Sequence, residues 1–146
     1  LFSIPGIRLG YIVSSSKKLE LIHKNRDPWP LNCFAIKAGM TLLKNKKNYD
    51  NWIKKIHNWI QIEREWFFNE LSKFNKLEVH STSTNFFLIE SQKSFLPNID
   101  YLSSKGILIR ECASFRSLNE NWARISIQTH QKNKKIADEI QNSFLN

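Results

Sequence analysis

Apolar residues recur every three or four positions between residues 49 and 74, and this spacing predicts one long helix. One stripe of the helix would contain Ile53, Ile56, Ile60, Phe67, Leu71 and Phe74, and a second stripe Trp52, Trp59 and Trp66. So wide an apolar surface must be covered on two sides, either by two layers of the same protein or by a partner subunit. Tryptophans at this spacing can stack on nucleic-acid bases, but packing in a core or an interface is commoner, and we favour packing.

After residue 76 the pattern changes to short apolar segments separated by polar turns. The predicted elements are strands over 77–80, 85–90, 107–110 and 122–128, and helices over 97–105 and 132–144. Pro97 opens the first of these helices, and Gly106 is placed to end it in a left-handed conformation. In the last helix Ile136, Ile140 and Phe144 should face inward. This order of strands and helices is typical of an α+β fold in which helices pack on a small sheet.

The first part of the chain predicts a strand over 7–13, a serine-capped helix over 17–25 and an apolar helix over 31–44. Pro28 and Pro30 separate the two helices, because proline cannot continue the helical hydrogen bonds. The chain begins with Leu1 in what resembles a loop, so we expect the N-terminus to be a cut.

Composition indicates a folded protein. The 146 residues are 41% hydrophobic and 12% aromatic, which is enough for a core of ordinary size. Cys33 and Cys112 match no zinc or redox spacing, so a reducing, cytoplasmic setting is expected. No apolar run approaches the roughly 20 residues that span a bilayer, so no membrane partner is expected.

The formal net charge of +9 makes nucleic acid, an anionic membrane or an acidic small molecule conceivable partners. The lysines are spread over separate polar stretches, which favours a solvated surface over a nucleic-acid face. A basic nucleic-acid-binding module and a noncatalytic interaction domain remain the alternatives to an enzyme.

Common catalytic motifs are missing from the sequence. The four histidines are scattered, without a second ligand at the spacing of a metal site, so no metal is expected. The sequence also contains no P-loop, no nucleophile elbow and no paired carboxylates, which gives hydrolase hypotheses little support.

Arg8, Arg110 and Arg124 each lie in an apolar segment, although most cations of this chain are lysines in polar stretches. A guanidinium among β-branched residues needs an anionic partner, and its planar fork suits phosphate or carboxylate. The alternative is that the three arginines form structural salt bridges or occupy half-exposed strand positions.

Five segments resemble motifs of the class I/II aminotransferases, in order along the chain. Residues 4–11 (IPGIRLGY) resemble the segment after the cofactor lysine, 27–32 (DPWPLN) the P-W-x-[VL]-N segment, and 84–88 (TNFFL) the [AT]-N-F-x-L strand. Residues 106–115 (GILIRECASF) are similar to a segment of threonine-phosphate decarboxylases, and 122–127 (WARISI) to a strand of the family. Each motif is weak alone, but the series is specific.

The resemblance implies the small C-terminal domain of a fold-type I pyridoxal-phosphate enzyme over 49–146, with helices on a mostly antiparallel sheet. Residues 1–48 would be a strand-helix remnant of the large cofactor-binding domain. By position, Arg8 would bind the phosphate of pyridoxal 5'-phosphate, Arg124 the substrate carboxylate or another substrate anion, and Arg110 a further substrate anion.

The same resemblance places the Schiff-base lysine eight positions before Arg8, immediately before Leu1, so no catalytic residue is expected in this chain. We therefore expect a fragment that is inactive alone. The whole enzyme would be a homodimer acting on a phosphorylated amino acid. Decarboxylation of threonine phosphate is favoured, and transamination of histidinol phosphate is the close alternative.

Overall fold

The computed structural model describes residues 2–145, which form two compact units. The first unit extends to Ile56 and the second begins at His57, so the division falls within one helix, α3 (Lys46–Leu71). The expected large-domain remnant over 1–48 and small domain over 49–146 stay predictions. No helix in the described part of the chain is long and apolar enough to cross a membrane.

The first unit consists of short helical elements with almost no core. It contains the 3-10 helix η1 (Pro5–Ile7), α1 (Ser16–Lys24), α2 (Cys33–Leu43) and the start of α3. Asn32 caps α2, since its side chain accepts a hydrogen bond from the Ala35 backbone N–H at 2.8 Å. Ala35 is the only buried residue among residues 2–56.

The predicted strand over 7–13 is wrong. The backbone from Arg8 to Ser15 is irregular, and Tyr11 and Val13 are 91% and 85% exposed. A strand exists only when its backbone groups pair with a neighbouring strand, and no described residue pairs with this segment. The β-branched residues of this segment have the composition of a strand, but no strand of the described residues lies beside them to form a sheet.

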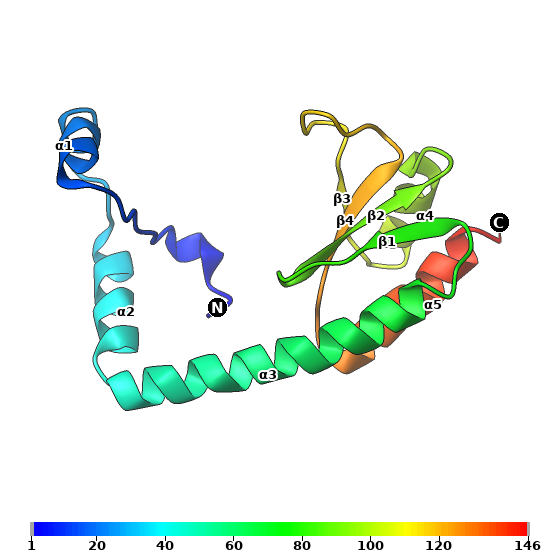
Figure 1. The fold of residues 1–146 in the computed structure, drawn as a ribbon, viewed down its shortest axis with the longest axis horizontal. Helices are drawn as coiled ribbons and strands as arrows, with labels where there is room; N and C mark the ends of the chain where they lie inside the picture. Colours follow the sequence, from blue (N-terminus) through cyan, green and yellow to red (C-terminus); the bar gives the residue numbers. More distant parts are fainter. Residues whose placement is uncertain (1, 146) are drawn as a thin grey trace. The chain divides into compact units, whose positions relative to one another are not determined.

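The second unit is the expected α+β fold (Figure 1). Four strands, β1 (Leu77–His80), β2 (Phe86–Ser91), β3 (Arg110–Glu111) and β4 (Trp122–Ser126), pair antiparallel in the order β1-β2-β4-β3. The second half of α3 packs on one face of this sheet together with α4 (Leu96–Ser104) and α5 (His130–Ser143).

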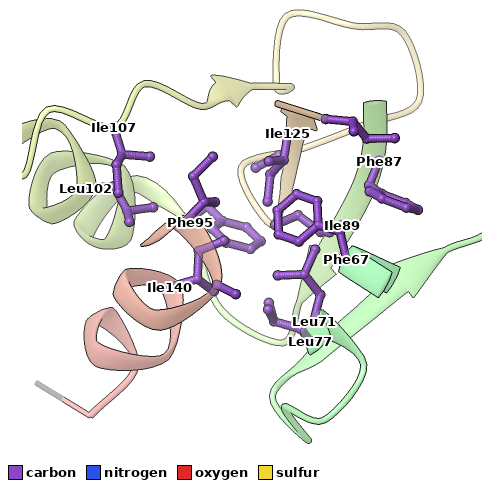
Figure 2. Packing of buried hydrophobic residues seen from close by; sticks show 14 residues of the cluster. Phe67, Leu71, Leu77, Phe87, Ile89, Phe95, Leu102, Ile107, Ile125 and Ile140 are labelled. Atoms are coloured by element: carbon purple, nitrogen blue, oxygen red, sulfur yellow. The ribbon is translucent and has the colours of Figure 1, made fainter. Parts of the chain in front are cut away.

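The core lies between that sheet face and the helices (Figure 2). Alternation along β2 directs Phe87 and Ile89 inward, where Phe87 meets Phe67 of α3 edge to face at 5.9 Å between ring centroids. Ile136 and Ile140 of α5 are buried in the same cluster, as their spacing predicted.

The strand predicted over 107–110 is shorter than expected because the helix before it uses part of its backbone. Gly106 has φ +72°, and the Ile107 N–H donates to the Leu102 carbonyl at 2.9 Å. This is the hydrogen-bond pattern of a Schellman cap, which confirms the predicted helix end at Gly106. Strand pairing therefore begins only at Arg110.

Candidate anion-binding site

Arg110 and Arg124 occupy directly opposed positions in the sheet. Their Cα atoms are register partners between β3 and β4, so both side chains project from the same face. Leu88 is the partner of Arg124 on its other side. Both arginines are exposed, whereas their strand neighbours Ala123 and Ile125 are buried in the core. The arginine face is thus the sheet face that α3, α4 and α5 leave uncovered.

Neither of these arginines forms an ion pair with any residue of 2–145. Glu111, the nearest acid in sequence, instead accepts a hydrogen bond from the Ala113 backbone N–H at 2.6 Å. Structural salt bridges at Arg110 and Arg124 are therefore absent within the described chain, whereas the other alternative, strand positions open to solvent, agrees with the exposure of both side chains. Like charges in opposed strand positions destabilise a sheet, so the pair has an energetic cost that an external anion would relieve.

Each guanidinium lies against an aromatic ring. The Cζ atom of Arg124 is 4.9 Å from the centroid of Phe86, and that of Arg110 is 5.8 Å from the centroid of Phe115. Arg110 also donates through Nη2 to the Ser114 Oγ at 3.4 Å. These contacts orient the side chains while leaving most of their N–H donors open.

Backbone hydrogen bonds place Phe115 beside Arg110. The Cys112 N–H donates to the Trp122 carbonyl at 3.1 Å, which extends the pairing of β3 with β4, and the Phe115 N–H donates to the Cys112 carbonyl at 3.0 Å. Burial raises the pKa of the Cys112 thiol above its ordinary value, and the positive charge of Arg124 opposes that rise. The buried thiol therefore lies within the electrostatic influence of the arginine pair.

Arg8 belongs to the first unit and is not in a strand. It ends η1 in the left-handed region, at φ 58° and ψ 34°, and its backbone N–H donates to the Pro5 carbonyl at 3.1 Å. The side chain is exposed, and its one recorded contact is a long Nη1 hydrogen bond of 3.5 Å to the same carbonyl. No described carboxylate pairs with it, so Arg8 too is open to an anion.

Sequence reasoning missed a cluster of Glu78, His80 and Glu90 on β1 and β2, whose possible metal-ligating atoms lie within 4.8 Å of one another. A search for ligands one helical turn apart overlooks it, because Glu78 and Glu90 meet only through the strand register. The His80 Nε2 atom lies 3.8 Å from Glu90, beyond hydrogen-bond distance. Exposed acidic groups commonly cluster without an ion, so this geometry alone assigns no metal.

The family model "Aminotransferase class I and II" matches residues 1–140. Among curated relatives, the threonine-phosphate decarboxylase of Salmonella typhimurium is 26% identical over 142 residues, which cover 97% of this chain and 38% of the relative. A histidinol-phosphate aminotransferase of Methanococcus maripaludis is 31% identical over 146 residues, covering 96% and 38%. The chain thus spans about 38% of the length of these relatives.

Two solved structures resemble the chain over almost its whole length. The histidinol-phosphate aminotransferase from Clostridium acetobutylicum matches with a TM-score of 0.83 and 33% identity, over 97% of this chain and 42% of that one. The L-threonine-O-3-phosphate decarboxylase from Porphyromonas gingivalis matches with a TM-score of 0.85 and 28% identity, over 99% and 44%.

Proposed function

Because this chain belongs to the class I and II aminotransferase family, we propose that it forms part of a pyridoxal-phosphate enzyme acting on a phosphorylated amino acid. The observation that carries the proposal is the pair Arg110 and Arg124, opposed on one sheet face without any carboxylate partner in the described chain. A phosphorylated amino acid brings a phosphate and a carboxylate, and two planar guanidiniums suit these two groups.

The residues present fit the phosphate of pyridoxal 5'-phosphate. Arg8 lies in the segment 4–11, which resembles the family segment after the cofactor lysine. Its side chain is exposed and has no carboxylate partner among residues 2–145. In this proposal Arg8 holds the cofactor phosphate. The bound cofactor would supply the electron sink that weakens one bond to the substrate α-carbon. The first lysine of the chain is Lys17, after Arg8, so the lysine expected before the motif has no counterpart here.

In this proposal Arg124 orients the substrate carboxylate or another substrate anion, and Arg110 holds a second anion. Their separation across one strand pair fixes the spacing of the two groups, which orients the bound substrate. Decarboxylation of threonine phosphate is our first choice, because residues 106–115 follow the pattern of that enzyme. Transamination of histidinol phosphate is the alternative; this phosphorylated amino alcohol has no carboxylate, so it would engage the arginine pair through its phosphate alone.

The test uses the full-length enzyme, with the segment before Leu1 restored, and offers it each substrate with pyridoxal 5'-phosphate. Carbon dioxide release from O-phospho-L-threonine supports the decarboxylase. Amino transfer from histidinol phosphate to 2-oxoglutarate without carbon dioxide release supports the alternative. Turnover of neither substrate contradicts the proposal.

Matched variants separate charge from geometry. Arg110→Lys and Arg124→Lys keep the positive charge but lose the planar fork, so we expect a raised KM for the phosphorylated substrate. Arg116→Lys, at an exposed position in the loop after β3, serves as the control.

The 146-residue chain alone should show no turnover, and full-length enzyme should elute as a homodimer in size-exclusion chromatography with light scattering.

A further inference from the structure

Two adjacent phenylalanines in β2 have different environments. Phe87 is 1% exposed and packs in the core, whereas Phe86 points to the opposite face of the sheet and is half-buried. Phe86 is the register partner of Ser126, two residues beyond Arg124, so it lies diagonally across the strand pair from Arg124. Side chains at such diagonal positions are close enough for an aromatic ring to contact a long neighbour.

The ring of Phe86 contacts the guanidinium of Arg124 at 4.9 Å, inside the range of a favourable cation–π interaction. This contact differs from a salt bridge in one important respect. A carboxylate would occupy the N–H donors that an incoming anion needs, whereas an aromatic ring attracts the positive charge without being a conventional hydrogen-bond acceptor for those donors. Phe86 therefore restrains Arg124 without competing for its ligand.

An unrestrained arginine samples many rotamers and must lose that freedom when it binds an anion. A side chain that already rests on a ring loses less of it. Phe115 is 44% exposed and lies 5.8 Å from Arg110, so its contact is longer and more open to water than that of Phe86. The aromatic contact is thus closer at Arg124, whereas Arg110 is also held by its hydrogen bond to the Ser114 Oγ.

We propose that Phe86 is a positioning residue, whose ring preorganises the Arg124 guanidinium for an anion. The identity of the anion, a group of an amino-acid substrate, rests on the proposed function. The claim that an anion binds at Arg124 with the help of Phe86 is independent of the proposed function.

The first test measures binding of inorganic phosphate to the 146-residue chain, followed through the NMR signals of the arginine Nε–H groups. Phe86→Leu should weaken phosphate binding at Arg124 by about two- to ten-fold, the size of a cation–π contact at a partly exposed site. Phe86→Tyr, which keeps an aromatic face, should restore wild-type affinity. If Phe86→Leu unfolds, Phe86→Met provides the unbranched replacement.

Leu88→Ala is the matched control. Leu88 lies directly opposite Arg124 on the same face and, like Phe86, is half-buried, but it offers no ring. Its truncation should leave phosphate affinity unchanged. Equal affinity of wild type and Phe86→Leu, failure of Phe86→Tyr to restore binding, or absence of a phosphate-dependent shift at Arg124 in the wild type would each overturn the proposal.

The second test uses the full-length enzyme and separates this proposal from the proposed function. With O-phospho-L-threonine, Phe86→Leu should raise KM and leave kcat unchanged, because Phe86 acts only through the binding arginine. A fall in kcat with unchanged KM would contradict a positioning role. If the enzyme turns over no phosphorylated amino acid, the proposed function fails, while the phosphate titration still decides the role of Phe86.

Discussion

Arg110 and Arg124 face each other across β3 and β4 without an intervening negative charge in the described chain. Their mutual repulsion acts against folding, and it is screened by salt because both side chains are exposed. A sheet selected for stability alone would place opposite charges or apolar residues at these positions. An anion bound between the two guanidiniums would offset this repulsion.

Replacing one member of the pair should therefore stabilise the ligand-free chain. We expect Arg110→Gln to raise the free energy of unfolding by about 0.2–1 kcal/mol at low salt. The gain should shrink toward zero at about 1 M salt, where the screening length is only a few ångströms. Urea unfolding at both salt concentrations measures it. Arg116→Gln, which removes an exposed arginine outside the sheet, should show no such gain.

Cys112 can report on Arg124. Burial raises the pKa of this thiol and Arg124 lowers it, so Arg124→Gln should raise the pKa of Cys112 further. The measurement is the rate at which Cys112 reacts with a thiol reagent, in chains where Cys33→Ser removes the other thiol. The pH at which this rate begins to rise should be higher in Arg124→Gln than in the parent chain. Unfolded chains lose the thiol proton first, so the free energy of unfolding should fall as pH rises past the ordinary thiol value. An unchanged rate profile in Arg124→Gln would contradict the predicted influence of Arg124 on Cys112.

Sequence could identify the arginines but not their surroundings. Arg110 and Arg124 stand out because a charge is rare within an apolar segment, whereas Phe86 looks like any other apolar strand residue. Its contact with Arg124 depends on the pairing of β2 with β4, which brings together residues nearly forty positions apart. The acids of the cluster around His80 likewise meet only through strand register. Pairing of this kind cannot be inferred from one sequence.

The C-terminal end of α4 tests whether a single glycine determines where a helix ends. Gly106 has φ +72°, and a Cβ there would meet no atom within 4 Å, so any cost of adding a methyl group comes from the backbone conformation. We expect Gly106→Ala to lower the free energy of unfolding by about 1–2 kcal/mol. Gly10→Ala is the control, since Gly10 also has open space but no left-handed φ. Equal free energies of unfolding for the two variants would show that the left-handed conformation of Gly106 does not contribute to stability.

Element prediction succeeded where the signal was local and failed where it depended on a partner. The strand over 77–80 and the helix ending at Gly106 follow from spacing and turn residues, and both are observed. The strand over 7–13 is absent because its pattern specifies a β-conformation without supplying the neighbour that would hold it. Buried polar contacts were equally invisible: Glu63 of α3 accepts a hydrogen bond from Asn133 of α5 at 2.9 Å.

The two units of the chain differ in how much of their surface is buried. The second unit has a continuous core, whereas the described residues of the first bury only Ala35. Phe34 and Met40 of α2 are 77% and 67% exposed, although the helix is strongly apolar. Sequence predicted the apolar character of α2 but could not show that residues 2–56 leave it uncovered.

This difference predicts separate stabilities for the two units. Short helices without tertiary packing are marginal in water, so amides of α1 and α2 should exchange hydrogen almost as fast as an unstructured peptide. Amides of β2 and β4 should be protected to the level of global unfolding. Ile89→Ala, which removes about 2–5 kcal/mol from the core of the second unit, should reduce protection there and leave α1 and α2 unchanged.

The same hydrogen-exchange measurement can be made on the full-length protein. Because the chain spans only about 38% of its curated relatives, we expect the additional sequence to supply the contacts that α2 lacks. Amides of α2 should then become protected, and the exposed Phe34 and Met40 should lose access to solvent. A Phe34→Ser substitution should lower the free energy of unfolding of the full-length protein while leaving that of the 146-residue chain almost unchanged. Equal effects in both proteins would show that α2 has the same environment with and without the additional sequence.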